Sequence, residues 1–138
     1  MLKVLVVDDA LIMRKKVSTA LSDIGHKVIG TAENGEIAIK MVKKYKPDLV
    51  TMDITMPNIN GIVATKRIRE FDKEVKIIMV TSHGQEEMVL KSLKEGAKGY
   101  LLKPVTKDKL EQSIASVFPE YQEDEDDCLL DSFDLDED

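Results

Sequence analysis

Residues 48–61 have the sequence DLVTMDITMPNING, and the prediction of the fold starts from this stretch. Its first five residues, 48–52, form a largely apolar run that is bounded by turn-forming residues and is too short for a helix, so we predict a strand that ends at Asp53. In an alternating α/β sheet, the carboxyl ends of parallel strands open into the ligand crevice. Asp53 is therefore expected in a site at that edge, although an Asp that merely begins a turn would also fit this stretch alone.

The rest of the chain repeats a strand followed by a helix. Apolar β-rich runs predict strands at residues 2–7, 27–31, 48–52, 76–80 and 98–102. Apolar residues at three- and four-residue spacing predict helices at 11–24, 34–45, 61–71, 85–95 and from 106 onward. This order predicts an α/β fold with a five-stranded parallel sheet, a (βα)5 doubly wound sandwich with helices on both faces. In the third helix we expect Ala64, Ile68 and Phe71 on the buried side.

Composition describes a single globular domain of 138 residues, with 43% hydrophobic and 33% charged residues. No apolar run approaches the roughly 20 residues of a membrane span, and the first residues lack a signal-peptide pattern. We therefore expect a cytoplasmic protein without membrane insertion. The single cysteine, Cys128, cannot form an internal disulfide, which is consistent with a reducing compartment.

The net charge of −6 divides into two parts of opposite sign. Residues 119–138 hold 11 of the 26 acidic residues and no Lys or Arg, so residues 1–118 carry a net +5. We expect a folded domain over residues 1–118 and an acidic tail over 119–138 that is disordered or docks conditionally. Apolar side chains within residues 128–135 suggest docking on the lysine-bearing fourth and fifth helices. Negative charge in this segment argues against a nucleic-acid partner.

Three of the predicted strands end in charged side chains. Asp8 and Asp9 follow the first strand, Asp53 the third and Lys103 the fifth, while Thr81 follows the fourth. Because parallel strands end at one edge, these side chains are expected to converge. Clustered carboxylates need a cation, and hard oxygen donors suit Mg²⁺. Together the groups suit phosphoryl transfer to a carboxylate, with Lys and metal neutralising charge on the transferred oxygens.

Four segments carry a family resemblance: VLVVDDALIMR (residues 4–14), VTMDITMPNING (50–61), MVTSHG (79–84) and GYLLKP (99–104). The chain resembles the receiver domain of two-component response regulators over residues 1–118. The compact single-domain form with Tyr100 is most similar to the chemotaxis regulators of that family. The resemblance implies a flavodoxin-like fold.

The resemblance also implies roles by position. Asp53 would be the phosphoacceptor, with Asp9 and Asp53 as Mg²⁺ ligands, Asp8 acting largely through water, and the Thr55 backbone carbonyl as a further ligand. The implied protein is a phospho-switch and not a turnover enzyme, since it catalyses only its own phosphorylation and slow autodephosphorylation.

Further positions are implied to act on the phosphoryl group or to respond to it. Lys103 and Thr81 would contact the group, Tyr100 would be the aromatic switch, and Thr55 and His83 would tune dephosphorylation. In this family the peptide bond between the Lys and the following Pro is commonly cis. The expected partners are a histidine kinase, a phosphorylation-dependent target such as the flagellar motor switch, and a phosphatase, with the protein itself a monomer.

Other functions remain open from the sequence alone. A single-domain phosphorelay intermediate would share nearly all of these residues. A Mg²⁺-dependent aspartyl-phosphate hydrolase of the haloacid dehalogenase type would place its second Asp two positions after the nucleophile, whereas Asp8 and Asp9 are adjacent. A nucleotide-binding protein would need a glycine-rich loop after the first strand, which this chain lacks.

Overall fold

A computed structural model describes residues 1–119 of the chain. The expectations for the acidic tail, that it is disordered or docks on the fourth and fifth helices, fall on residues outside this range. Within residues 1–119, no helix has the length and apolarity that a membrane crossing requires.

Strands and helices alternate throughout the described residues. Their order is β1 (Lys3–Val7), α1 (Leu11–Asp23), β2 (Lys27–Ala32), α2 (Gly35–Tyr45), β3 (Leu49–Asp53), α3 (Gly61–Phe71), β4 (Lys76–Thr81), α4 (Glu86–Lys94), β5 (Gly99–Leu102) and α5 (Lys107–Val117). Asparagine or threonine side chains cap three of the helices by accepting a backbone N–H from the first turn: Asn34 for α2, Asn60 for α3 and Thr106 for α5. The predicted order of elements is confirmed.

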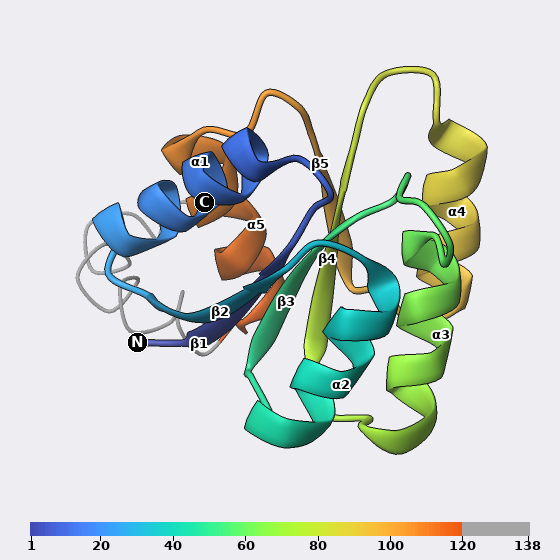
Figure 1. Ribbon diagram of the computed structural model, residues 1–138. Helices are drawn as coiled ribbons and strands as arrows, with labels where there is room; N and C mark the ends of the chain where they lie inside the picture. The colour runs from blue at the N-terminus through green and yellow to red at the C-terminus, as the bar shows by residue number, and fades with distance from the viewer. Residues whose placement is uncertain (120–138) are drawn as a thin grey trace, which may run out of the picture.

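The strands form one parallel sheet in the order β2-β1-β3-β4-β5. Helices α1 and α5 lie on one face of the sheet, and α2, α3 and α4 lie on the other (Figure 1). This is the doubly wound, flavodoxin-like sandwich that the sequence predicted. In this strand order the first and third strands are direct neighbours, which brings residues about 45 positions apart to the same place.

Alternating side chains of the central strands fill two separate cores. In β1, Val4 and Val6 pack with α1 and α5, while Leu5 and Val7 belong to the cluster under α2, α3 and α4. Burying each such side chain contributes about 1.5–3 kcal/mol, and a one-residue slip would exchange the two faces. The cores therefore fix the register, and with it the level at which every strand ends.

The prediction for Phe71 is wrong. Its side chain is 41% exposed, whereas Ala64 and Ile68 of the same helix are fully buried as expected. Phe71 is the last residue of α3, and its ring lies 4.9 Å from the Lys43 ammonium of α2. A cation over the face of an aromatic ring stabilises a half-exposed aromatic side chain, so Phe71 contacts Lys43 at the surface and does not belong to the core.

Candidate functional site

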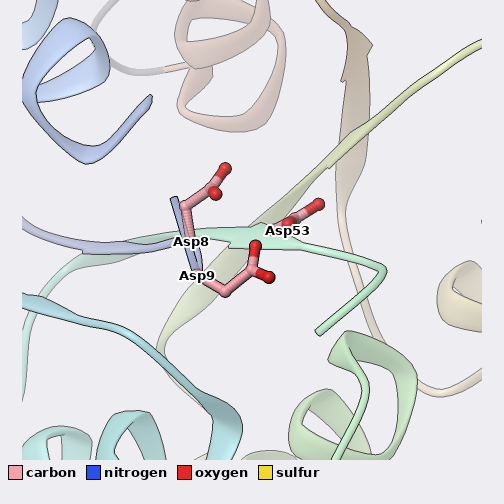
Figure 2. Close-up of side chains that lie close together, drawn as sticks. All are labelled: Asp8, Asp9 and Asp53. Carbon is pink, nitrogen blue, oxygen red and sulfur yellow. The ribbon is translucent and has the colours of Figure 1, made fainter. Parts of the chain in front are cut away.

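Three carboxylates meet at the carboxyl edge of the sheet. Asp8 and Asp9 directly follow β1, and Asp53 is the last residue of β3. The register of these neighbouring strands pairs Val7 with Met52, so all three acids stand at the same level. Figure 2 shows the side chains gathered there, and one carboxylate oxygen from each lies within 4.8 Å of the others. The convergence expected from the sequence is present.

The two inner acids are buried and held by the backbone. Asp8 is 3% and Asp53 is 5% exposed, whereas Asp9 is open to solvent. The Ala10 backbone N–H donates to the Asp8 carboxylate at 2.9 Å, and the Arg14 guanidinium donates to the Asp8 carbonyl at 2.8 Å. These contacts fix the turn between β1 and α1, so the two adjacent acids keep different exposures.

Lys103 is the cation of the cluster. It follows β5, two strands away from β3, and its long side chain brings Nζ to 3.6 Å from both Asp8 and Asp53. Its backbone N–H donates to the Thr81 carbonyl at 2.8 Å, and its peptide bond to Pro104 is cis. Lys103 therefore starts from the strand on the far side of β4 and reaches across the edge of the sheet to the two buried carboxylates.

The environment of Asp53 raises the pKa of its carboxyl from 3.8 to about 6. Burial is the largest cause, followed by the negative charge of Asp8, with a smaller contribution from Asp9. Lys103 and a hydrogen bond from the Thr55 backbone act in the opposite direction. At neutral pH the carboxylate is mainly ionised and poorly solvated, which suits a nucleophile.

The donor set fits a magnesium ion. Three carboxylates offer only hard oxygen ligands, and their spacing allows a single ion to contact more than one of them. No cysteine or histidine belongs to the cluster, so the softer ligands that favour zinc or copper are absent from this group of residues. An open side toward solvent, at Asp9, leaves room for the waters that Mg²⁺ retains.

Position 61, where α3 begins, has no room for a side chain. A Cβ at this position would lie 2.3 Å from the Asp53 carbonyl oxygen and 3.0 Å from the Ile54 Cα. The Gly61 N–H also donates to the Ile54 carbonyl at 2.7 Å. The start of α3 is thus held directly against the end of β3, and only glycine leaves room for this approach.

The other site residues predicted from the sequence, Thr81, Tyr100, Thr55 and His83, differ in their exposure to solvent. Thr81 is buried at the end of β4, with its hydroxyl 2.6 Å from the Gln85 side-chain oxygen. Tyr100 is 51% exposed and lines a groove of about 310 Å³ beside α4. Thr55 and His83 are exposed in the loops after β3 and β4. Among residues 1–119, no hydrogen bond or ion pair joins His83 to the acids.

Sequence reasoning missed two residues. Arg14 was part of the motif that follows β1, but nothing in the spacing indicated its bond to the Asp8 carbonyl. Gln85 was assigned only to the start of a helix, yet its amide contacts both Thr81 and Thr55. A glutamine at a helix start is an unusual cap, and this was the available signal.

Known proteins resemble this chain in both sequence and fold. Residues 4–115 match the response regulator receiver domain family. The chain is 42% identical over 112 residues to the chemotaxis protein CheY of Bacillus subtilis, covering 81% of this chain and 93% of the relative. It is 46% identical over 115 residues to the chemotaxis protein CheY of Halobacterium salinarum, covering 83% and 95%.

Two solved structures share the fold of this chain. The CheX–CheY–BeF3–Mg²⁺ complex from Borrelia burgdorferi contains a chain that superposes with a TM-score of 0.80 at 38% identity, covering 84% of this chain and 88% of the other. A two-component response regulator of the LuxR family from Aurantimonas superposes with a TM-score of 0.79 at 30% identity, covering 85% and 84%. The chain belongs to the response regulator receiver domain family.

Proposed function

We propose that this chain is a phosphorylation-controlled response regulator in which Asp53 accepts a phosphoryl group from a histidine kinase. The observation that carries the proposal is the cluster itself: three carboxylates within 4.8 Å, with the Lys103 ammonium 3.6 Å from the two buried ones. A structural ion pair would need only one acid for Lys103, whereas two buried acids lie 3.6 Å from it and a third acid lies beside them. With one lysine against three carboxylates the group keeps an excess of negative charge, so a cation such as Mg²⁺ is needed to balance it, and phosphoryl transfer uses such an ion.

In the transfer step, a carboxylate oxygen of Asp53 attacks the phosphorus of the donor's phosphohistidine. The new P–O bond forms as the P–N bond breaks, and the imidazole leaves with the electron pair and takes up a proton. Asp53 is suited to this because it is ionised above pH 6 and only 5% exposed. Lys103 donates to a phosphoryl oxygen, a role for which its position beside Asp53 is suited.

Asp9, Asp53 and the Thr55 backbone carbonyl would hold Mg²⁺, with Asp8 acting through water. When bound, the ion neutralises negative charge on the transferred phosphoryl oxygens and on the acids. The protein's contribution is to keep Asp8 and Asp9 at fixed, different depths through the Ala10 and Arg14 contacts.

The phosphoryl group changes a neighbouring surface, which we call the output surface: α4, β5 and α5. Phosphorylation adds about −1.5 to −2 charges and three acceptor oxygens, toward which the Thr81 hydroxyl turns. Tyr100 then moves toward the space beside Thr81, since both line the same groove with Leu90 and Leu93. A partner that prefers this shape shifts the population toward it.

Chemotaxis is the favoured process, with a flagellar motor switch or similar protein as target and a phosphatase as a further partner. The relatives named chemotaxis protein CheY match over nearly their whole length, which supports chemotaxis as the process. A phosphorelay intermediate is the second candidate, because the same site also accepts and returns phosphoryl groups. Two experiments separate these candidates. A chemotaxis switch should bind a motor protein only when phosphorylated, whereas a phosphorelay intermediate should pass its phosphoryl group to a histidine of another protein.

The site is tested by incubation with acetyl phosphate and Mg²⁺, followed by intact-mass measurement. We expect one phosphoryl group per chain, lost in Asp53→Asn and in the presence of a chelator. Asp48→Asn, directly before the start of β3 and so at the far end from Asp53, is the matched control and should be labelled like the wild type. Labelling of Asp53→Asn at the wild-type rate would refute the assignment, and release of many phosphates per minute would favour the hydrolase.

A further inference from the structure

The side chain of Gln85 joins two loops of the site through three hydrogen bonds. Its Oε1 accepts from the Thr81 hydroxyl at 2.6 Å and from the Ser82 backbone N–H at 3.0 Å. Its Nε2 donates to the Thr55 hydroxyl at 2.7 Å. One amide therefore connects the end of β4 with the loop that follows β3, although these residues are up to 30 positions apart.

The directions of these bonds are fixed by chemistry. The Ser82 backbone N–H can only donate, so the amide oxygen, and not the nitrogen, must face it. That oxygen can only accept, so Thr81 must donate its single hydroxyl proton to Gln85. The nitrogen then faces Thr55 and donates to it. The Ser82 carbonyl, at 3.4 Å, is a more distant acceptor for the Thr81 hydroxyl than Gln85 at 2.6 Å, so the Thr81 proton is committed to Gln85.

Gln85 does not serve its own helix. It occupies the N-cap position of α4, but its side chain accepts no N–H from the first turn of that helix. The caps of α2, α3 and α5 each do so. A residue that leaves its helix uncapped while making three bonds elsewhere contributes to the loops of the site, at the expense of the helix end.

We propose that Gln85 is a positioning residue that stabilises the unphosphorylated arrangement by holding the Thr81 hydroxyl away from Asp53. The inference rests on the proposed function, since it concerns the response to a phosphoryl group on Asp53. For Thr81 to donate to that group, the bond to Gln85 must break, and Thr81 is 1% exposed, so water has little access to replace it. The same movement frees Thr55, which couples the two loops.

The unphosphorylated protein provides the first test. Side-chain amide protons of Gln85, followed by NMR, should exchange with solvent more slowly than those of Gln112, which is exposed on α5. Thr55→Val removes the acceptor and should abolish the difference. Equal exchange of the two glutamine amides in the wild type would show that the bridge does not persist in solution and would overturn the proposal.

The second test measures affinity for beryllofluoride, a phosphoryl mimic, in the presence of Mg²⁺. Gln85→Met keeps the length of the side chain but makes none of the three bonds. Loss of a hydrogen bond of ordinary strength shifts an equilibrium by about two- to tenfold, so Gln85→Met should bind beryllofluoride about two- to tenfold more tightly. Gln112→Met is the matched control and should bind like the wild type. In a Thr81→Ala background, Gln85→Met should have no effect.

Each outcome distinguishes the proposals. Unchanged or weaker binding by Gln85→Met, in a wild type that does bind beryllofluoride, refutes the role of Gln85 and leaves the proposed function intact. A wild type that does not bind beryllofluoride refutes the proposed function and this inference with it. If Gln85→Met unfolds, Gln85→Ala and the NMR exchange of the wild type still decide the question.

Discussion

Replacing Asp53 by asparagine should stabilise the metal-free protein at neutral pH. The substitution keeps the shape of the side chain and removes a charge that burial and Asp8 both disfavour. Lys103 retains Asp8 as an ion-pair partner at 3.6 Å, so the lysine is not left alone. Because Asp53 is only 5% exposed, solvent screens the repulsion between Asp53 and Asp8 only weakly.

The magnitude and its pH dependence follow from the pKa of Asp53. The pKa of Asp53 rises from 3.8 in the unfolded chain to about 6 in the folded protein, which corresponds to about 3 kcal/mol, since a shift of one pKa unit is worth about 1.4 kcal/mol. The folded state binds this proton more tightly, so Asp53 favours folding at low pH and loses that contribution as the pH rises through about 6. The stabilisation by Asp53→Asn should therefore be near zero below pH 3.8 and reach up to about 3 kcal/mol at pH 7.

The assay is urea unfolding followed by far-UV circular dichroism between pH 4 and 8, with a chelator present. The quantity of interest is the unfolding free energy of Asp53→Asn minus that of the wild type, because titration of other groups largely cancels in the difference. Asp48→Asn provides the control at the other end of β3. A difference that does not change with pH, or a less stable Asp53→Asn at pH 8, would refute this reasoning.

Four further outcomes are expected. Mg²⁺ at 100 times its Kd should stabilise the wild type by about 2.7 kcal/mol at pH 8. The same concentration should stabilise it less below pH 6, because protons then compete with the ion for Asp53. Equal stabilisation at both pH values would contradict this expectation. Gly61→Ala should lower the unfolding free energy by about 1–3 kcal/mol and slow labelling by acetyl phosphate, because its Cβ meets the Asp53 carbonyl. Thr55→Ala/His83→Ala should change the autodephosphorylation rate, with little effect on urea unfolding; unchanged decay would exclude the role proposed for the pair. If the acidic tail docks, a chain ending at Phe118 should differ from the full chain at low salt in partner affinity and in amide exchange on α4 and α5; identical values in the two chains would exclude docking.

The elements were predictable because their signals are local. Strand runs and helical spacing are each read from fewer than 15 consecutive residues, and the caps Asn34 and Thr106 mark two of the helix starts. The bounds moved by one or two residues where tertiary bonds decide them. Asp53, for example, continues β3 because the neighbouring strand β4 pairs with it at Val80.

The cluster of charged groups was predictable for a different reason. Parallel topology places every strand end at one edge, so Asp8, Asp9, Asp53 and Lys103 could be expected together without coordinates. The exposures of the three acids could not be predicted, because they depend on local contacts such as those of Ala10 and Arg14 with Asp8. Gln85 lay beyond prediction as well, since its role depends on the orientation of one amide between two loops.

Two opposing contributions act on the unphosphorylated site. Acid repulsion and burial at Asp53 disfavour the ionised metal-free state by about 3 kcal/mol, while the Gln85 bond to Thr81 favours that same arrangement by about 1 kcal/mol. A bound cation relieves the first contribution, and a phosphoryl group that draws Thr81 toward it must overcome the second. Since both are a few kcal/mol at most, neither arrangement is excluded, and a partner with modest preference for one can shift the population. A residue such as Gln85 then sets how much of the active arrangement exists before any phosphate arrives.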